Sequence, residues 1–217
     1  MINFDKTIAT TIVVSAMLLG SSVKALETNG VDLKYVTGDI TGLKTSNLNG
    51  QDLTINVTGF KVSLGSKTAL GGEDDDENAP LLTGHIEKLN DDDSNESITK
   101  ADIGVLAKIG NITYITGTIG LLSSSIGDST ITTTDDILGG SFLKVGGGFT
   151  GSLGDYLELS GGYSRYFTLG EGMNELDMGV KYIFYGDAAI SVDYTSSSGA
   201  LSTVSGNRVA TGLAIQF

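Results

Sequence analysis

The chain contains no cysteine and no tryptophan, only one histidine and one proline, and half as many basic as acidic residues. Without cysteine it has no disulfide framework, thiolate metal site, catalytic thiol or lipid-modified N-terminal cysteine. The single histidine, His85, excludes a metal centre built from several imidazoles. With 13 Lys and Arg against 26 Asp and Glu, the net charge is −13, which argues against nucleic acid as a partner. We expect no cofactor.

The N-terminal segment predicts a secretory signal peptide over residues 1–25. Lys6 precedes an apolar stretch that runs from Ile8 to Leu19, and Val23-Lys24-Ala25 fits the small residues before a cleavage site. The apolar stretch is shorter than the roughly 20 residues that a membrane helix needs. We therefore expect an exported mature chain of residues 26–217.

Strict alternation of side-chain type follows this segment and is clearest at the C-terminus. One face of the last segment is mostly apolar, with Val209, Thr211, Leu213, Ile215 and Phe217. The opposite face is small or polar, with Arg208, Ala210, Gly212, Ala214 and Gln216. A period of two residues is typical of a β-strand. No window after residue 25 has the 18 uninterrupted apolar residues of a membrane helix.

The length of the alternating segments favours a transmembrane barrel over a soluble β-sandwich. They run to about 10 residues, which lets a tilted strand cross the hydrocarbon core, whereas strands of soluble sheets usually have about 5–6 residues. The non-apolar face is rich in Gly, Ser and Ala, as a narrow lumen requires. We therefore expect an all-β fold: a transmembrane antiparallel up-and-down β-barrel over residues 26–217, located in a bacterial outer membrane.

Ten alternating segments can be counted, and an even number is typical of bacterial barrels. They are residues 31–37, 52–64, 81–90, 99–109, 112–122, 138–150, 155–167, 174–185, 188–196 and 206–217. Counted from the C-terminus, short and long connections alternate, as expected for inner turns and outer loops. The long connection 65–80 breaks this alternation. Either it is an unusual inner loop, or the first two segments are misassigned and the barrel has eight strands.

Short glycine-rich motifs follow one another between about residue 85 and residue 217. They are Asn90-Asp91-Asp92-Asp93 before strands around Gly110, then Val145-Gly146-Gly147-Gly148, Gly154-Asp155 and Gly212-Leu213-Ala214. In this order they resemble the YfaZ-type outer-membrane proteins of Gram-negative bacteria. The resemblance implies a small outer-membrane barrel and carries over no catalytic motif. By analogy with other outer-membrane barrels, the terminal Phe217 resembles the signal that the barrel assembly machinery reads.

Alternate positions place a set of charged residues on the inner face of the expected barrel. They are Asp32, Lys34, Lys108, Lys144, Glu158, Glu175, Asp177, Lys181, Asp193 and Arg208. Glu158 and Lys144 fall on adjacent segments, and buried charges must be paired or hydrated. Two interpretations stay open: the charges pair and fill the lumen, or they line a thin aqueous path and tune ion selectivity. We favour a filled lumen, because open channels are typical of barrels with 16 or more strands.

Several tyrosines lie at the ends of the expected strands. Tyr156 and Tyr185 flank inner turns, whereas Tyr166 and Tyr194 fall at the outer strand ends. Because tyrosine is enriched where a membrane meets water, these positions predict an aromatic girdle.

Two acidic runs, residues 73–77 and 91–93, are expected to be solvated loops rather than metal sites. The segment from Asp91 begins like a calcium-binding EF-hand loop, but Glu96 stands where the sharp turn requires glycine.

We expect a structural membrane protein or a narrow passive channel for ions and small solutes, and not an enzyme. Its expected partners are outer-membrane lipids, lipopolysaccharide and the barrel assembly machinery. One alternative is a lipid-directed hydrolase that uses His85, although the chain has no Gly-x-Ser-x-Gly motif. The other is surface recognition through the outer loops 91–98, 123–137 and 197–205.

Overall fold

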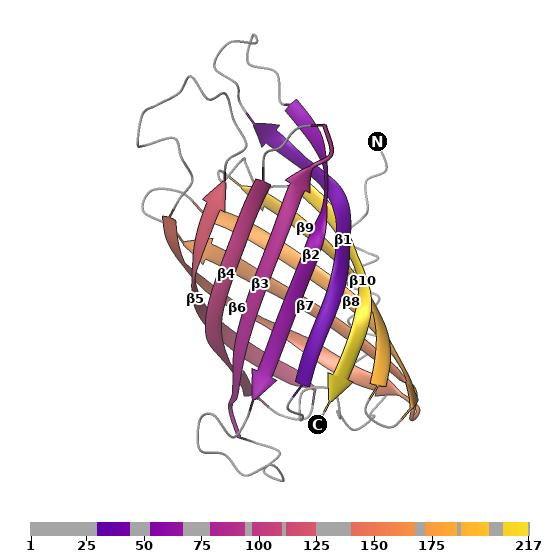
Figure 1. Cartoon of the computed structure of the whole chain (residues 1–217). Helices are drawn as coiled ribbons and strands as arrows, with labels where there is room; N and C mark the ends of the chain where they lie inside the picture. Colours follow the sequence, from indigo (N-terminus) through magenta and orange to yellow (C-terminus); the bar gives the residue numbers. More distant parts are fainter. Residues whose placement is uncertain are drawn as a thin grey trace, which may run out of the picture.

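The computed structural model of the chain is a closed antiparallel β-barrel of ten strands (Figure 1). It describes residues 30–43, 53–66, 79–93, 97–109, 112–124, 140–167, 172–185, 188–199 and 206–216. The strands are β1 (Gly30–Leu43), β2 (Leu53–Ser66), β3 (Leu81–Asp91), β4 (Ser97–Lys108), β5 (Thr113–Ser124), β6 (Gly140–Leu153), β7 (Leu157–Phe167), β8 (Gly172–Tyr185), β9 (Ala188–Gly199) and β10 (Gly206–Gln216). The predicted fold class and strand number are confirmed. The eight-strand alternative is wrong, because β1 and β2 are both part of the wall.

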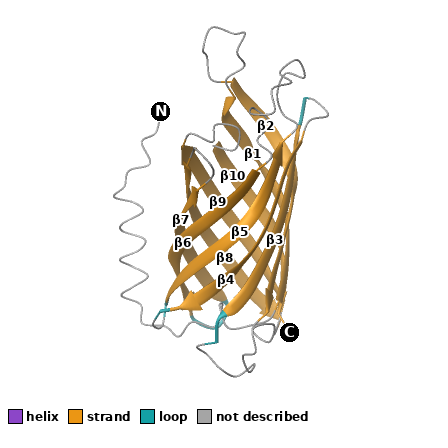
Figure 2. Ribbon diagram, turned by 90° about the vertical axis from the view of Figure 1, so that its left-hand side faces the viewer, coloured by secondary structure: helices purple, strands orange, loops and turns teal. Residues whose placement is uncertain are grey.

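Each strand pairs with its neighbours in the sequence, and the barrel closes where β1 meets β10. Short connections join β4 to β5, β6 to β7 and β8 to β9 at one end of the barrel, which we call the turn end. The connection after β2, whose last residue is Ser66, lies at this same end. The opposite end, which we call the loop end, carries the other five connections (Figure 2). The segment 65–80 therefore connects two wall strands at the turn end.

Several expectations fall on residues outside the described part of the chain. They are the signal peptide at residues 1–25, the assembly signal at Phe217, the acidic run at residues 73–77 and most of the outer loops 123–137 and 197–205. Among the described residues, no helix is long and apolar enough to cross a membrane.

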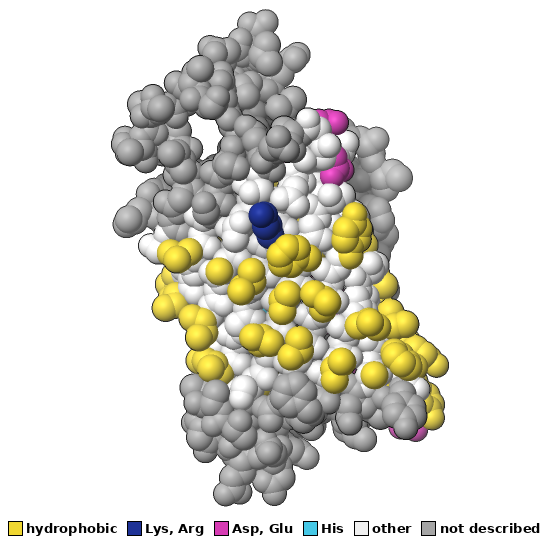
Figure 3. All heavy atoms as spheres, in the orientation of Figure 1, with side chains coloured by type: hydrophobic (Ala, Val, Ile, Leu, Met, Phe, Trp, Pro, Cys, Tyr) yellow, Lys and Arg dark blue, Asp and Glu magenta, His cyan; other side chains and the backbone are white. Residues whose placement is uncertain are grey.

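The outer surface of the wall is apolar. The exposed large side chains include Leu33, Ile86, Ile103, Ile119, Leu121, Tyr163, Tyr182, Ile190, Leu213 and Ile215. In Figure 3 the apolar side chains gather across the middle of the face shown, and acidic side chains appear only toward its margins. Monomeric soluble proteins rarely expose contiguous apolar patches of more than a few hundred Å². This distribution is the reverse of a soluble β-sandwich and matches a wall that faces lipid.

Glycine is required at specific points of the wall. Gly154, in the turn between β6 and β7, has a φ of 71°, a left-handed conformation that L side chains rarely adopt. Gly148 faces the lumen, and a Cβ atom there would lie 2.6 Å from the hydroxyl of Tyr114 and 2.3 Å from the carbonyl oxygen of Gly161. Glycine at this position therefore leaves room for a tyrosine side chain inside the barrel.

Candidate functional site in the lumen

The lumen is filled by apolar side chains near the loop end. We call this layer the apolar plug, formed by Val36, Ile40, Val57, Leu89, Ile98, Leu122, Phe142, Tyr166, Met173 and Ala210. These residues come from nine of the ten strands and form one cluster in which no residue is more than 8% exposed. Phe142 and Tyr166 pack with tilted rings, 5.1 Å between centroids. Because the cluster draws on almost every strand, apolar side chains from most of the circumference of the wall meet at this level.

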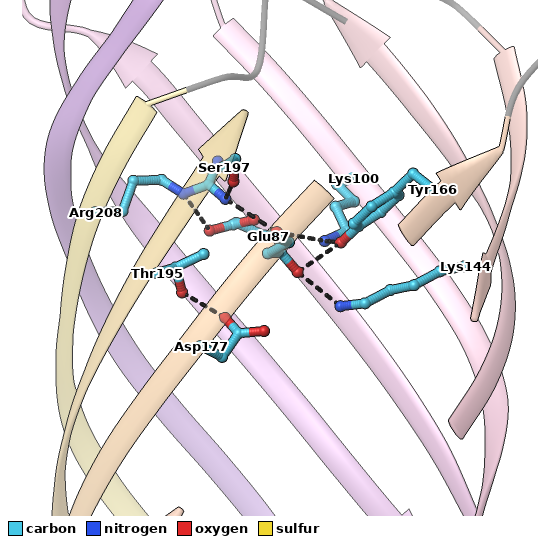
Figure 4. Close-up of polar contacts among 9 residues, drawn as sticks. Glu87, Lys100, Lys144, Tyr166, Asp177, Thr195, Ser197 and Arg208 are labelled. Atoms are coloured by element: carbon cyan, nitrogen blue, oxygen red, sulfur yellow. Dashed lines mark hydrogen bonds and ion pairs between the residues drawn. The ribbon is translucent and has the colours of Figure 1, made fainter. Parts of the chain in front are cut away.

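A layer of charged residues lies directly beneath the plug. On four strands a charged residue lies two positions nearer the turn end than a plug residue. The pairs, plug residue first, are Leu89 and Glu87, Ile98 and Lys100, Phe142 and Lys144, and Met173 and Glu175. Positions two apart in a strand share a face. Together with Arg208 and the hydroxyl of Tyr166, we call this layer the ion cluster (Figure 4).

Glu175 is the centre of the ion cluster. Its Oε1 atom accepts hydrogen bonds from Lys144 Nζ at 2.7 Å and from the Tyr166 hydroxyl at 2.8 Å. Its Oε2 atom accepts one from Arg208 Nη2 at 3.3 Å, with Lys100 Nζ at 4.0 Å. The Glu175 side chain is 4% exposed. One buried carboxylate is thus surrounded by three cations, which is the arrangement that makes a buried carboxylate tolerable.

The rest of the ion cluster surrounds this carboxylate. Lys100 donates a hydrogen bond to the Tyr166 hydroxyl. The ammonium groups of Lys100 and Lys144 lie 4.8 and 5.0 Å from the centroid of the Tyr166 ring, within cation–π range. Arg208 also donates to Ser197 Oγ at 3.2 Å. Glu87 forms an ion pair with Arg208, with 3.9 Å between Glu87 Oε1 and Arg208 Nε. The cluster therefore ties together side chains from β3, β4, β6, β7, β8, β9 and β10.

A polar cavity of about 220 Å³ lies below the ion cluster. Lys61, His85, Asp102, Tyr114, Thr118 and Asp177 are among the residues that line it. Four buried polar atoms in its lining have no hydrogen-bond partner: Thr83 Oγ1, His85 Nδ1, Asp102 Oδ1 and Thr118 Oγ1. Buried polar groups are usually paired with protein or with ordered water. A polar cavity of this size has room for several water molecules, which would satisfy these atoms.

Ion pairs continue toward the turn end. Lys34 contacts Asp193 and lies 2.8 Å from Asp32. Glu158 faces Lys181 directly across β7 and β8, with 3.5 Å between the charged atoms. Mixed charge therefore extends along the lumen below the plug.

The structure places the expected inner-face charges as follows. Lys144, Glu175 and Arg208 are in the ion cluster, and Asp177 lines the cavity and accepts a hydrogen bond from Thr195 at 2.8 Å. Glu158, Lys181, Asp193, Asp32 and Lys34 form the turn-end pairs. Lys108 ends β4 at the turn end.

Glu158 and Lys144 lie on the adjacent strands β7 and β6, as expected, but they do not form a pair. In the register of β6 and β7, Lys144 lies opposite Tyr166, eight residues along the strand from Glu158. Glu158 lies opposite Ser152 on that side and opposite Lys181 on the other. The two residues do share the inner face, but they lie at different levels of the barrel.

Tyr166 is also placed differently from the expectation. It is 2% exposed and points into the lumen instead of belonging to an outer aromatic girdle. Tyr194 does lie on the outer face, where its hydroxyl donates to Asn207 Oδ1 at 2.8 Å. The alternation of β7 already carries this information, since Tyr166 is an even number of residues from Glu158.

The charged lumen residues that were not recognised from the sequence include Lys61, Glu87 and Lys100. A signal for Lys100 was present, because it is in phase with Asp102 and Lys108 on β4. Glu87 is similarly in phase with His85 on β3. Extending the alternation to the N-terminal strands would have identified all three.

His85 lies opposite Asp102 in the register of β3 and β4. Its Nδ1 atom has no hydrogen-bond partner, and neither do the nearby hydroxyls of Thr83 and Thr118. A catalytic base must be within hydrogen-bonding reach of the proton that it removes. In this structure the histidine is thus a residue of the lumen cavity whose Nδ1 atom forms no hydrogen bond with a hydroxyl group.

Of the acidic loops, the structure describes the run Asp91–Asp93. It is attached to the loop end of β2, where Thr58 Oγ1 donates to Asp92 Oδ1 at 2.8 Å and the Asp92 amide donates to the Asn56 carbonyl at 3.0 Å. The Asp93 amide donates to Asp91 Oδ1 at 3.1 Å. Within the described part of the chain, no three His, Cys, Asp or Glu side chains are placed to hold a metal ion.

Comparison with known proteins finds similar solved structures but no similar sequence. No protein-family model matches it, and no curated protein matches its sequence. Similar solved structures include the translocator domain of the autotransporter NalP from Neisseria meningitidis, with a TM-score of 0.48 and 10% identity over 97% of this chain and 95% of that one. Another is the outer membrane phospholipase A from Escherichia coli, with a TM-score of 0.37 and 11% identity over 94% of this chain and 97% of that one.

Proposed function

We propose that the protein is an integral β-barrel of the bacterial outer membrane with a closed lumen, and that it acts as a structural wall protein rather than as an open channel or an enzyme. The observation that carries the closed lumen is the apolar plug, to which nine of the ten strands contribute. The exposed apolar wall supports the membrane location.

Closure by side chains agrees with the size of the barrel. Barrels of about eight strands have interiors that side chains can fill, whereas aqueous channels are typical of 16 or more strands. The plug and the ion cluster beneath it are two successive filled layers. Ions would have to cross an apolar constriction and then a layer of paired charges, and both oppose conduction.

A narrow passive channel is the second candidate, and the polar cavity favours it. The cavity of about 220 Å³ and the charges toward the turn end give the lower lumen the character of an aqueous vestibule. Conduction would then require only that the plug opens. The hydrolase alternative receives no such support, because His85 lies within the lumen without a bonded hydroxyl.

Single-channel recording in planar bilayers tests the closed lumen. We expect no conductance steps from the wild-type barrel, provided that its heat-modifiable gel migration shows it to be folded. A double variant, Leu89→Ala with Phe142→Ala, removes plug volume and is expected to conduct. The matched control, Lys88→Ala with Leu143→Ala, alters the neighbouring outward positions and is expected to stay silent. Steps from the wild-type barrel would refute a closed lumen.

A further inference from the structure

An apolar groove crosses the outside of the wall from β2 to β7. Its volume is about 940 Å³; most of its lining comes from outward residues of two adjacent rows, and the inner-face residues His85, Asp102, Gly120 and Phe142 complete it. One row contains Leu64, Gly84, Ile103, Ile119, Leu143 and Phe167, which are successive partners in the strand register. The next row toward the loop end contains Val62, Ile86, Ala101, Leu121 and Ser141. We call this feature the wall groove.

The groove is hollow where small residues interrupt these rows. Gly84 on β3 and Ala101 on β4 stand between large apolar side chains such as Ile86 and Ile103. A Cβ atom built at Gly84 would meet only the carbonyl oxygen of Asp102, at 3.8 Å, so the space outside it is open. A hollow with apolar walls on a lipid-facing surface suits an acyl chain.

Cations are scarce on the outside of the wall, and one of them borders the groove. Among the described strand residues, the outward positions carry two cations, Lys88 on β3 and Arg165 on β7. Lys88 is exposed and lies two residues toward the loop end from Ile86. Arg165 is already engaged, because its guanidinium lies 5.5 Å from the centroid of the Phe167 ring.

The surroundings of Lys88 fit an anionic headgroup. The next row toward the loop end contains Phe60, Lys88 and Thr99, so a hydroxyl stands beside the ammonium group across the strand pair. Lys88 is three residues from the end of β3. A lysine on the lipid face costs about 2–4 kcal/mol at the bilayer midplane but only about 0–1 near the interface. Lys88 is therefore placed where phosphate groups lie, directly above the hollow at Gly84 and Ala101.

We propose that the wall groove binds lipopolysaccharide, with an acyl chain against Gly84 and Ala101 and a phosphate on Lys88. This inference rests on the proposed outer-membrane location, which puts the loop end in the leaflet that contains lipopolysaccharide. In such a lipid the phosphate lies above the acyl chains, and on the wall Lys88 likewise lies on the loop-end side of the hollow at Gly84 and Ala101. A second copy of the chain fits less well, because a two-fold interface over this groove would bring like charges together.

The experiment measures lipid retained by the full-length barrel. The protein is refolded in detergent without lipid and incubated with purified lipopolysaccharide or, separately, with phosphatidylglycerol. Bound lipid is then counted by native mass spectrometry. We expect one retained lipopolysaccharide per barrel, and about tenfold weaker retention for Lys88→Gln, the effect of losing one charged hydrogen bond. Arg165→Gln is the matched control and is expected to retain the lipid.

A second pair of variants tests the hollow itself. Ala101→Phe fills it and is expected to reduce retention, whereas Ala107→Phe, an outward position of β4 outside the groove, is expected not to. Equal losses for Lys88→Gln and Arg165→Gln, unchanged retention in Ala101→Phe, or preferential retention of phosphatidylglycerol would each overturn the proposal. Bilayer recordings on the same preparations separate the two proposals, because a silent wild-type barrel that retains no lipopolysaccharide would refute only the lipid site.

Discussion

Glu175 is the residue whose neutralisation should most weaken this barrel. Its carboxylate accepts hydrogen bonds from Lys144 and Arg208 and lies 4.0 Å from Lys100 Nζ, and the side chain is 4% exposed. The substitution Glu175→Gln keeps the shape of the side chain but removes its charge. Arg208, which is buried, and Lys100 and Lys144, whose side chains are 17% exposed, would then lose this carboxylate, and of the three Arg208 keeps Glu87 at 3.9 Å.

The size of the effect follows from the burial of these cations. Breaking a buried ion pair by removing one partner typically costs about 3–5 kcal/mol, because the other charge is left uncompensated. We expect the free energy of unfolding to fall by about this amount. That corresponds to a drop in the folding equilibrium constant of at least about a hundredfold, since 1.4 kcal/mol is a factor of ten.

Glu158→Gln is the matched control. The Glu158 side chain is also 4% exposed, but its ion pair is with Lys181 alone, whose side chain is 23% exposed. Only one cation loses its partner there, and its side chain is slightly more exposed than that of Lys144 at 17%, so the substitution should cost less. The two variants therefore make the same chemical change at equally buried carboxylates, and they differ in whether the carboxylate has three cationic partners or one.

The assay is guanidinium unfolding of barrels refolded into lipid vesicles. The chain lacks tryptophan, so the transition is followed by far-ultraviolet circular dichroism and by heat-modifiable gel migration. Adding Lys144→Met to Glu175→Gln should restore part of the lost stability, because it removes one uncompensated cation. Equal losses for Glu175→Gln and Glu158→Gln, or a loss below about 1 kcal/mol at Glu175, would show that the ion cluster is not organised around this carboxylate.

Three further variants test other parts of the structure by the same unfolding assay. Ile119→Arg places a charge on the outer face, where Ile119 is 63% exposed, and should cost about 2–4 kcal/mol in vesicles; a neutral outcome would contradict a lipid-facing wall. Gly148→Ala should cost about 1–3 kcal/mol, because the new Cβ would lie 2.3 Å from the carbonyl oxygen of Gly161, and unchanged stability would show that the strands can separate there. Thr118→Val removes a hydroxyl that water in the polar cavity would satisfy and should cost about 0.5–1.5 kcal/mol, so a neutral outcome would show that no water is bound at that atom.

The period of two residues was sufficient to predict the strands and their inner faces. All ten segments were recognised because a barrel that exposes apolar residues on one side of each strand repeats the same local signal. The N-terminal segment 31–37 was predicted too short: β1 extends from Gly30 to Leu43. Its loop-end half, which includes Thr41 opposite Thr54, is stabilised by pairing with β2, and local alternation does not report such pairing.

The position of a residue relative to its neighbours along the strands was harder to predict than the face of the wall on which it lies. Glu158 and Lys144 share the inner face, but the turn around Gly154 places Leu153 opposite Leu157, and that register puts Lys144 opposite Tyr166. An error of a few residues in a turn keeps the face when the shift is even, yet it changes every partner across the strand pair. Charge pairs inside a barrel therefore depend on turn geometry more than on strand pattern.

The layers inside the lumen repeat a simple pattern on several strands. Each of β3, β4, β6 and β8 has an apolar inner residue near its loop end and a charged one two positions nearer the turn end. On a single strand, such as Leu89 and Glu87 on β3, this order is unremarkable. The ion cluster forms through side chains that reach across rows: Lys100 and Lys144 both approach Glu175, although the register sets Lys100 opposite Leu122 and places Lys144 in the row of Met173. Sequence alternation therefore favoured a filled lumen and left a thin aqueous path open, and the contacts among the inner side chains support the filled lumen.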